Sequence, residues 1–323
     1  MTEPISGPSD KASATSGTKR ILHAVAVVVS LAVVVALVGV VRRDAPAAKA
    51  AWASAHVRWE WIALACASAL VGQWVYVLGW QRVVRDCGVD LPAWHAARMF
   101  FASNLGRYLP GGKAWQMGIV GMMASERGLP AAVLAATSLL QGIVGVVVGA
   151  LLLVITGGSA LGVSRGWLIV PVFGLACVIG APAILRQVPS LFTYAERRWP
   201  QIVHVTSWTM WSLVWTSIVN WVFWGIGLYL LARGLFPNPE PRFAAYIAAW
   251  SGPFLAGLVA VVAPAGLGVR DAAMTVMLRA AALSPGDVVV LVIIARVWGT
   301  VLEVVPAAIV LAIRGRRVRR LQE

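Results

Sequence analysis

The sequence is poor in charged side chains, and poorest in acidic ones. Only 12% of its 323 residues are charged, and 27 lysines and arginines outnumber 13 aspartates and glutamates. The mean hydropathy is +0.80. Soluble globular domains carry about twice this share of charge. The composition therefore excludes an ordinary water-soluble fold.

Cysteine and histidine are also scarce. The three cysteines are odd in number, and Cys66 and Cys177 lie inside apolar runs, which argues against a disulfide scaffold. The four histidines are scattered, and the sequence has no HExxH, GxSxG or Walker motif. We therefore expect no metal, no cofactor and no enzymatic activity.

Long apolar runs are present instead. Each approaches or exceeds the roughly 20 residues that a helix needs to cross a bilayer, and each is too long and too little alternating for a barrel strand. The sequence thus predicts an all-α, polytopic transmembrane helical bundle. In one run, Gly145 and Gly149 form a small-xxx-small pattern that predicts close helix packing. The runs cover residues 21–41, 61–80, 131–156, 166–186, 209–232 and 286–313.

The chain divides into one membrane domain and two tails. Residues 1–20 are rich in Ser, Thr, Gly and Pro, which predicts a disordered tail. The next run ends at Arg42 and Arg43 without a cleavage motif, so we expect a retained first helix in a transmembrane domain over 21–313. Residues 314–323 form a basic tail. Much of the positive charge flanks the apolar runs, which favours anionic lipid over nucleic acid as a partner.

Two further regions are apolar but interrupted. The first covers residues 92–125 and contains NLGRYLPGGKAW at 104–115; the second covers 242–283 and is interrupted at SGP, 251–253, and at APAGLG, 263–268. Proline followed by glycine stops one helix and lets the next begin. Each region therefore predicts a re-entrant or broken helical hairpin.

The spacing of prolines relates the two regions to each other. In each, a proline at the break is followed after 20 or 21 positions by a second proline, and eleven positions later by a polar residue within a long apolar helix. The distribution of Lys and Arg among the loops slightly favours hairpins that return to their own side, with both termini in the cytoplasm. The two halves then form an inverted repeat, as in many secondary transporters. The equivalent pairs are Pro110 and Pro264, Pro130 and Pro285, and Gln141 and Arg296.

Both breaks carry cations. A helix that starts near Gly112 is followed at once by Lys113, and one that starts near Gly268 by Arg270. Helix N-termini attract anions, and phosphate fits a helix start with an added cation best. The candidate substrate-binding residues are Asn104, Arg107, Gly112, Lys113, Arg270 and Arg296.

Two acidic residues, Glu303 and Asp271, are candidates for a counter-ion or proton carrier. Arg296 and Glu303 lie on one helix face but two turns apart, so we expect each to find its partner on a hairpin. Glu303 is expected to face Arg107, Lys113 or Arg270. In the alternative interpretation these residues form structural ion pairs, and Asp271 only completes a first helical turn. Arg98, Arg279, His95 and Gln116 are expected to be structural or interfacial.

The two motifs resemble one known family. NLGRYLPGGKAW at 104–115 and PAGLGVRDAA at 264–273 resemble the lysylphosphatidylglycerol synthase transmembrane region family, which includes flippase-like membrane proteins. The resemblance covers nearly the whole chain after residue 20, and Arg107 and Asp271 stand where Lys and Glu are usual. It implies a bundle related to the lipid-translocating half of the multiple peptide resistance factors. The residues after 313 leave no room for a soluble aminoacyl-transferase domain, so we do not expect synthesis of lysyl-phosphatidylglycerol.

The leading functional hypothesis is a transporter of the bacterial plasma membrane. It would act as a flippase or scramblase-like carrier of an anionic lipid, either a phospholipid or a polyprenyl-phosphate-linked sugar. The alternatives are a membrane-embedded enzyme of lipid or lipid-linked glycan synthesis and an accessory subunit of such an enzyme.

Overall fold

The structure is a computed structural model that describes the central part of the chain. It covers residues 42, 45–53, 55–108, 112–158, 162, 164–198, 204–237, 242–259 and 268–319. The predicted tail over residues 1–20 and the predicted first helix over 21–41 lie outside the described residues, as do the breaks at 109–111 and 260–267.

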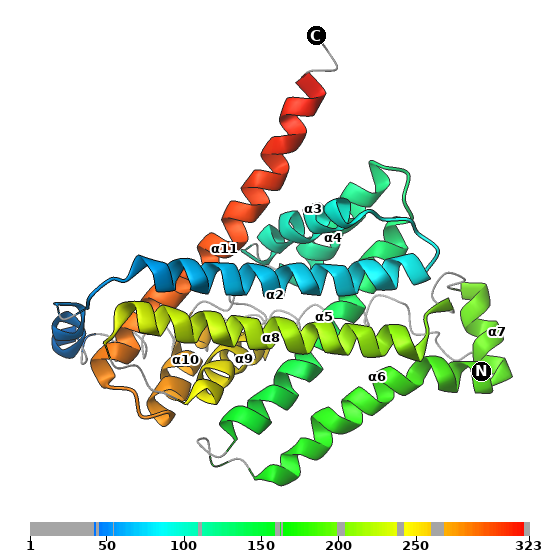
Figure 1. Cartoon of the computed structure of the whole chain (residues 1–323). Coiled ribbons are helices and arrows are strands. Elements are labelled where there is room, and N and C mark those ends of the chain that lie inside the picture. The colour runs from blue at the N-terminus through cyan, green and yellow to red at the C-terminus, as the bar shows by residue number, and fades with distance from the viewer. Residues whose placement is uncertain are drawn as a thin grey trace, which may run out of the picture.

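The described residues form an all-α bundle (Figure 1). Five helices are long and apolar enough to cross a membrane, and they match five of the six predicted runs. The protein is therefore a multi-pass membrane protein. These helices are α2 (Trp59–Asp86), α5 (Ala131–Gly157), α6 (Ile169–Gln187), α8 (Ser207–Leu235) and α11 (Pro285–Arg319).

Shorter helices occupy the two interrupted regions. The first region folds as α3 (Ala93–Asn104), the 3-10 turn η1 (Leu105–Tyr108) and α4 (Gly112–Ser125), and the second as α9 (Phe243–Val259) and α10 (Val269–Ala280). In each region the two short helices pack against each other. The predicted helix starts near Gly112 and Gly268 are correct, because α4 begins at Gly112 and Gly268 precedes α10 with a φ of 81°. Outside these regions, η2 (Arg165–Leu168) precedes α6, and α7 (Pro189–Arg198) follows it.

The order of helices recurs in the two halves. A long helix, two short helices and a second long helix appear as α2, α3, α4 and α5, and again as α8, α9, α10 and α11. The halves exchange equivalent contacts, because α5 packs on α9 and α11 packs on α3. The leading helices α2 and α8 are antiparallel, since Gly72 lies beside Asn220 whereas Gly79 lies beside Thr216. The repeat predicted from the proline spacing thus corresponds to two halves with the same order of helices, whose leading helices are antiparallel.

Glycines bring the long helices into close contact along α2 and α8, which lie side by side at the centre of Figure 1. A Cβ atom on Gly79 would lie 2.1 Å from Oγ1 of Thr216. The predicted small-xxx-small pattern works in the same way, because Trp221 of α8 lies against Gly149 and its indole nitrogen donates to the carbonyl oxygen of Gly145 at 2.9 Å. Backbone contact of this kind is the usual basis of helix association in lipid.

The interruption predicted at SGP, 251–253, is wrong. Helix α9 continues through Pro253 to Val259. Proline removes one backbone donor, but neighbouring helices and hydroxyl groups can support the turn within a membrane bundle. Here α5, α8 and α10 pack on α9, and the Ser251 hydroxyl donates to the carbonyl oxygen of Ile247 at 2.9 Å.

We expect Gly106→Ala to destabilise the protein by about 1–3 kcal/mol, as overpacking does in other cores. A Cβ atom at this position would lie 2.8 Å from the backbone nitrogen of Gln116 and 2.9 Å from the carbonyl carbon of Trp115. Gly118→Ala in α4 is the control, because a Cβ atom at this position would meet no atom within 4 Å. Thermal unfolding in detergent measures both variants. Equal melting temperatures would show that η1 does not depend on this close approach.

Candidate functional site

A cavity of about 510 Å³ lies where the two halves meet. Its lining residues come from both pairs of short helices and from α2, α5, α8 and α11. The volume lies within the usual range of about 300–1,000 Å³ for ligand pockets. Six of the eight candidate site residues line it, namely Asn104, Arg107, Arg270, Asp271, Arg296 and Glu303.

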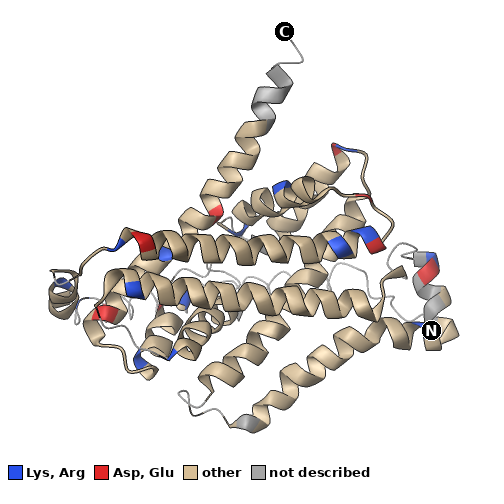
Figure 2. Ribbon diagram, viewed as in Figure 1, with Lys and Arg blue, Asp and Glu red and all other residues tan. Residues whose placement is uncertain are grey.

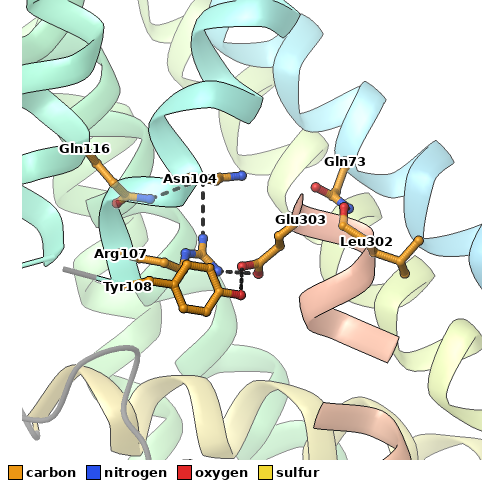
Figure 3. Close-up of polar contacts among 7 residues, drawn as sticks. All are labelled: Gln73, Asn104, Arg107, Tyr108, Gln116, Leu302 and Glu303. Atoms are coloured by element: carbon orange, nitrogen blue, oxygen red, sulfur yellow. Dashed lines mark hydrogen bonds and ion pairs between the residues drawn. The ribbon is translucent and has the colours of Figure 1, made fainter. Parts of the chain in front are cut away.

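Arg107 joins the first short-helix pair to α11 through Glu303 (Figure 3). One guanidinium nitrogen lies 2.6 Å from Oε1 of Glu303, and the Tyr108 hydroxyl donates to Oε2 at 2.7 Å. Both oxygens of the carboxylate are therefore engaged. The side chains of Arg107 and Glu303 are 24% and 13% exposed, so the pair is largely removed from bulk solvent. Glu303 thus pairs with Arg107, one of its three predicted partners.

Asn104 is oriented by two donors. Its Oδ1 accepts from Nε2 of Gln116 at 3.1 Å and from the Arg107 guanidinium at 3.4 Å. The sequence grouped Gln116 with structural or interfacial residues, but the structure places it in the cavity wall, where it holds the Asn104 amide (Figure 3). Helix α4 thus contributes to the cavity wall through the amide of Gln116.

The second short-helix pair is joined to the same helix by a looser contact. An oxygen of Asp271 lies 3.6 Å from a guanidinium nitrogen of Arg296. The other Asp271 oxygen accepts from the backbone N–H of Gly268 at 3.2 Å, which caps the start of α10. Asp271 therefore completes the first helical turn and also faces Arg296. As predicted, Arg296 and Glu303 each pair with a hairpin residue rather than with each other.

Arg270 differs from the other two arginines. Its guanidinium lies over the Phe254 ring, 4.8 Å from the centroid, and its stem packs against Gly257. Among the described residues, no carboxylate forms an ion pair with it. The described cavity wall holds three arginines and two carboxylates, so one positive charge is in excess.

The central stretches of the long helices α2 and α8 carry no charged residue (Figure 2). Between Glu60 and Arg82, helix α2 carries no charge, and α8 carries none before Arg233. The site charges lie on η1, α10 and α11 instead. Burying arginine at membrane depth costs about 2.5–3.5 kcal/mol on insertion scales. The cost of three arginines at one cavity is offset in part by the two ion pairs, which involve Arg107 and Arg296.

The remaining predicted residues are placed as follows. Gly112 opens α4, while the side chain of Lys113 lies outside the described part of the structure. Arg98, Arg279 and His95 do not line the cavity, and their predicted structural or interfacial role stays a prediction.

Sequence reasoning missed several neutral polar and aromatic residues of the wall. Gln73 of α2 and Asn220 of α8 are single amides within long apolar runs, and this isolation was a signal that could have identified them. Gln141 had been singled out as the counterpart of Arg296; it exchanges hydrogen bonds with Tyr76, at 2.7 and 3.0 Å. Three tryptophans had no such signal because tryptophan is common throughout this chain. The aromatic residues concerned are Tyr76, Tyr108, Trp221, Trp224 and Trp250.

The two ion pairs are expected to differ in strength. In double-mutant cycles, Arg107→Gln with Glu303→Gln should give a coupling energy of about 1–2 kcal/mol, because the atoms are 2.6 Å apart and partly shielded from solvent. Arg296→Gln with Asp271→Asn should give less than about 0.5 kcal/mol. Asparagine at 271 keeps an oxygen that can cap α10, so the second cycle isolates the ion pair. Thermal unfolding supplies the energies, and a stronger coupling at Arg296 would contradict this assignment.

Comparison with known proteins places the chain in a family. None of the curated proteins matches it. The family model described as "Lysylphosphatidylglycerol synthase TM region" matches residues 23–307, which include four of the five described spanning helices in full, α11 as far as residue 307 and every residue of the cavity wall. The match covers most of the chain, and the chain belongs to the lysylphosphatidylglycerol synthase TM region family.

Proposed function

We propose that this protein moves an anionic membrane lipid from one leaflet to the other, binding the lipid phosphate at Arg270. The observation that carries the proposal is that Arg270 faces the cavity without an ion-pair partner among the described residues, whereas Arg107 and Arg296 each have one. A bound phosphate would neutralise the one excess positive charge of the cavity wall. Charge-assisted hydrogen bonds from arginine to phosphate are among the stronger polar contacts in proteins.

The N-terminus of α10 contributes less to the proposed binding of phosphate than its position alone suggests. Asp271 already accepts from the N–H of Gly268, so part of the helix end is capped by the protein itself. The guanidinium of Arg270 is therefore the main attraction for the anion at this end. Lys113, next to the start of α4, is the equivalent residue of the other half.

The surroundings of the cavity favour a lipid over a soluble anion. Leu139 and Ile143 of α5 and Leu258 of α9 line the cavity and are also exposed at the surface of the bundle. Exposed apolar side chains on membrane helices face acyl chains. A headgroup could then enter the cavity while its chains stay in the bilayer.

The two-fold arrangement of the halves supports transport between leaflets. In this proposal the α3–α4 and α9–α10 pairs are re-entrant hairpins that enter the bacterial plasma membrane from opposite sides, as in carriers built from inverted repeats. Each hairpin is joined to α11 by one ion pair. Release of one pair while the other holds would open the cavity to one leaflet at a time.

Arg270→Ala should weaken binding of an anionic phospholipid about ten- to hundredfold, because it removes one charge-assisted contact. Lys113→Ala should act in the same direction, and Gly112→Leu should obstruct the approach of the headgroup to the start of α4. The readouts are lipid binding by native mass spectrometry and transbilayer movement of fluorescent phosphatidylglycerol and polyprenyl phosphate in liposomes.

Arg279→Ala is the matched control for this experiment. Arg279 lies on the same helix as Arg270 but is exposed and outside the cavity wall. It should bind and move lipid like the unmodified protein. If folded protein moved neither lipid class, transport would be excluded in favour of an enzymatic or accessory role. Unchanged binding in Arg270→Ala would exclude Arg270 as the anion site.

The proposed topology is tested by cysteine labelling from each side of the membrane. Three exposed positions are suitable for labelling. Position 126 follows α4, position 237 follows α8, and position 285 begins α11. In a background without Cys66, Cys87 and Cys177, Glu126→Cys should react from the cytoplasmic side, and Pro237→Cys and Pro285→Cys from the outer side. Labelling of position 126 from outside would contradict the inverted arrangement.

A further inference from the structure

The three arginines of the cavity wall are held in two different ways. Arg107 and Arg296 each face a carboxylate oxygen, at 2.6 and 3.6 Å. Arg270 lies instead over the ring of Phe254, with the central carbon of its guanidinium 4.8 Å from the ring centroid. Among the described residues, the charge of Arg270 is therefore stabilised by an aromatic ring, whereas the other two charges are stabilised by acids.

A ring and a carboxylate use different parts of a guanidinium group. The five N–H donors of arginine point outward in the plane of the group, so a carboxylate occupies them, whereas an aromatic ring attracts the charge from above that plane. Two nitrogens of Arg107 are engaged in the plane, by Glu303 at 2.6 Å and by Asn104 at 3.4 Å. A ring therefore stabilises a positive charge without occupying the donors that a phosphate needs.

Phe254 is itself held in place by a neighbouring helix. The ring of Trp221 on α8 packs edge-on against it, with the centroids 5.1 Å apart and the planes at 77°. Trp221 is 5% exposed, and its indole nitrogen donates to the carbonyl oxygen of Gly145 on α5 at 2.9 Å. A continuous series of contacts thus runs from the backbone of α5 through α8 and α9 to Arg270 on α10.

Helix α9 also fixes the aliphatic stem of Arg270. Gly257 lies three residues after Phe254, on the same side of the helix. A Cβ atom at Gly257 would lie 2.7 Å from Cγ and 3.0 Å from Cδ of Arg270, so the stem crosses α9 where the helix has no side chain. Phe254 and Gly257, which both line the cavity, together determine where the guanidinium lies.

We propose that Phe254 is a positioning residue for the anion site. Its ring holds the Arg270 guanidinium by a cation–π interaction and keeps it from turning to a carboxylate of the same wall, Asp271 or Glu303. The N–H donors of Arg270 then remain available to a phosphate. This inference rests on the proposed binding of an anionic lipid at Arg270 and assigns the residue that keeps this arginine in its binding position.

Fluorinated phenylalanines at position 254 test the proposal, because fluorine withdraws electron density from the ring face and changes the shape of the side chain little. The cation–π interaction weakens in steps from phenylalanine through its monofluoro to its trifluoro form. The affinity for phosphatidylglycerol, measured by native mass spectrometry, should fall in the same order and be about tenfold lower with the trifluoro ring. Binding of a diacylglycerol with the same acyl chains, which lacks the phosphate, should not change along the series.

A double-mutant cycle shows whether Phe254 acts through Arg270. Phe254→Leu removes the ring and should weaken binding of phosphatidylglycerol about tenfold, but it should have no further effect in protein that carries Arg270→Ala. A ring that contacted the lipid directly, or that served only in packing, would weaken binding equally in both backgrounds, and this result would overturn the proposal.

Phe243 is the matched control for the fluorinated series. It lies on α9 like Phe254 but outside the cavity wall, and its ring packs on Tyr229 at 6.1 Å. The same fluorinated residues at position 243 should leave the affinity for phosphatidylglycerol unchanged.

The outcomes separate this inference from the proposed function. If Arg270→Ala weakens binding of phosphatidylglycerol but the fluorinated series at position 254 does not, the role of Phe254 is excluded while the anion site stands. If Arg270→Ala leaves binding unchanged, or if folded protein binds no phosphatidylglycerol, the anion site and the role of Phe254 fail together.

Discussion

The contact between Arg107 and Glu303 joins parts of the chain that are 196 positions apart and defines one side of the cavity. Glu303 lies on the last long helix, and Arg107 on a single 3-10 turn whose backbone touches α4. Without Glu303, the positive charge of Arg107 would have no negative charge to neutralise it inside the bundle. Without Arg107, the negative charge of Glu303 would likewise be unpaired. Each charge is therefore tolerated only because the other half of the protein supplies its partner.

The same helix serves both halves. Glu303 and Arg296 are seven residues apart on α11, and each contacts a different pair of short helices. The contacts are unequal, 2.6 Å against 3.6 Å, so the first pair is held more firmly than the second. Because the two halves exchange equivalent helix contacts, this inequality marks a difference between two otherwise similar arrangements.

The cavity combines two kinds of wall. Arginines on η1, α10 and α11 supply excess positive charge, whereas α2, α5 and α8 supply amides and aromatic rings. Leu139, Ile143 and Leu258 add exposed apolar side chains to the same cavity wall. Charged, polar and apolar side chains of both halves therefore meet at one cavity.

The sequence by itself determined the helical class, the five described spanning helices, the extent of both interrupted regions and the residue types of the ionic site. These features are local: apolar length sets a span, and proline with glycine sets a break. It also predicted that Glu303 and Arg296 would find partners on the hairpins, because seven positions on a helix separate two side chains by about two turns. Tertiary structure alone decided which partners they found, since Arg107, Lys113 and Arg270 are chemically equivalent candidates for Glu303 until the chain is folded. The same holds for Pro253, whose helix continues because three neighbouring helices support it, and for Arg270, whose guanidinium lies over a ring from another helix.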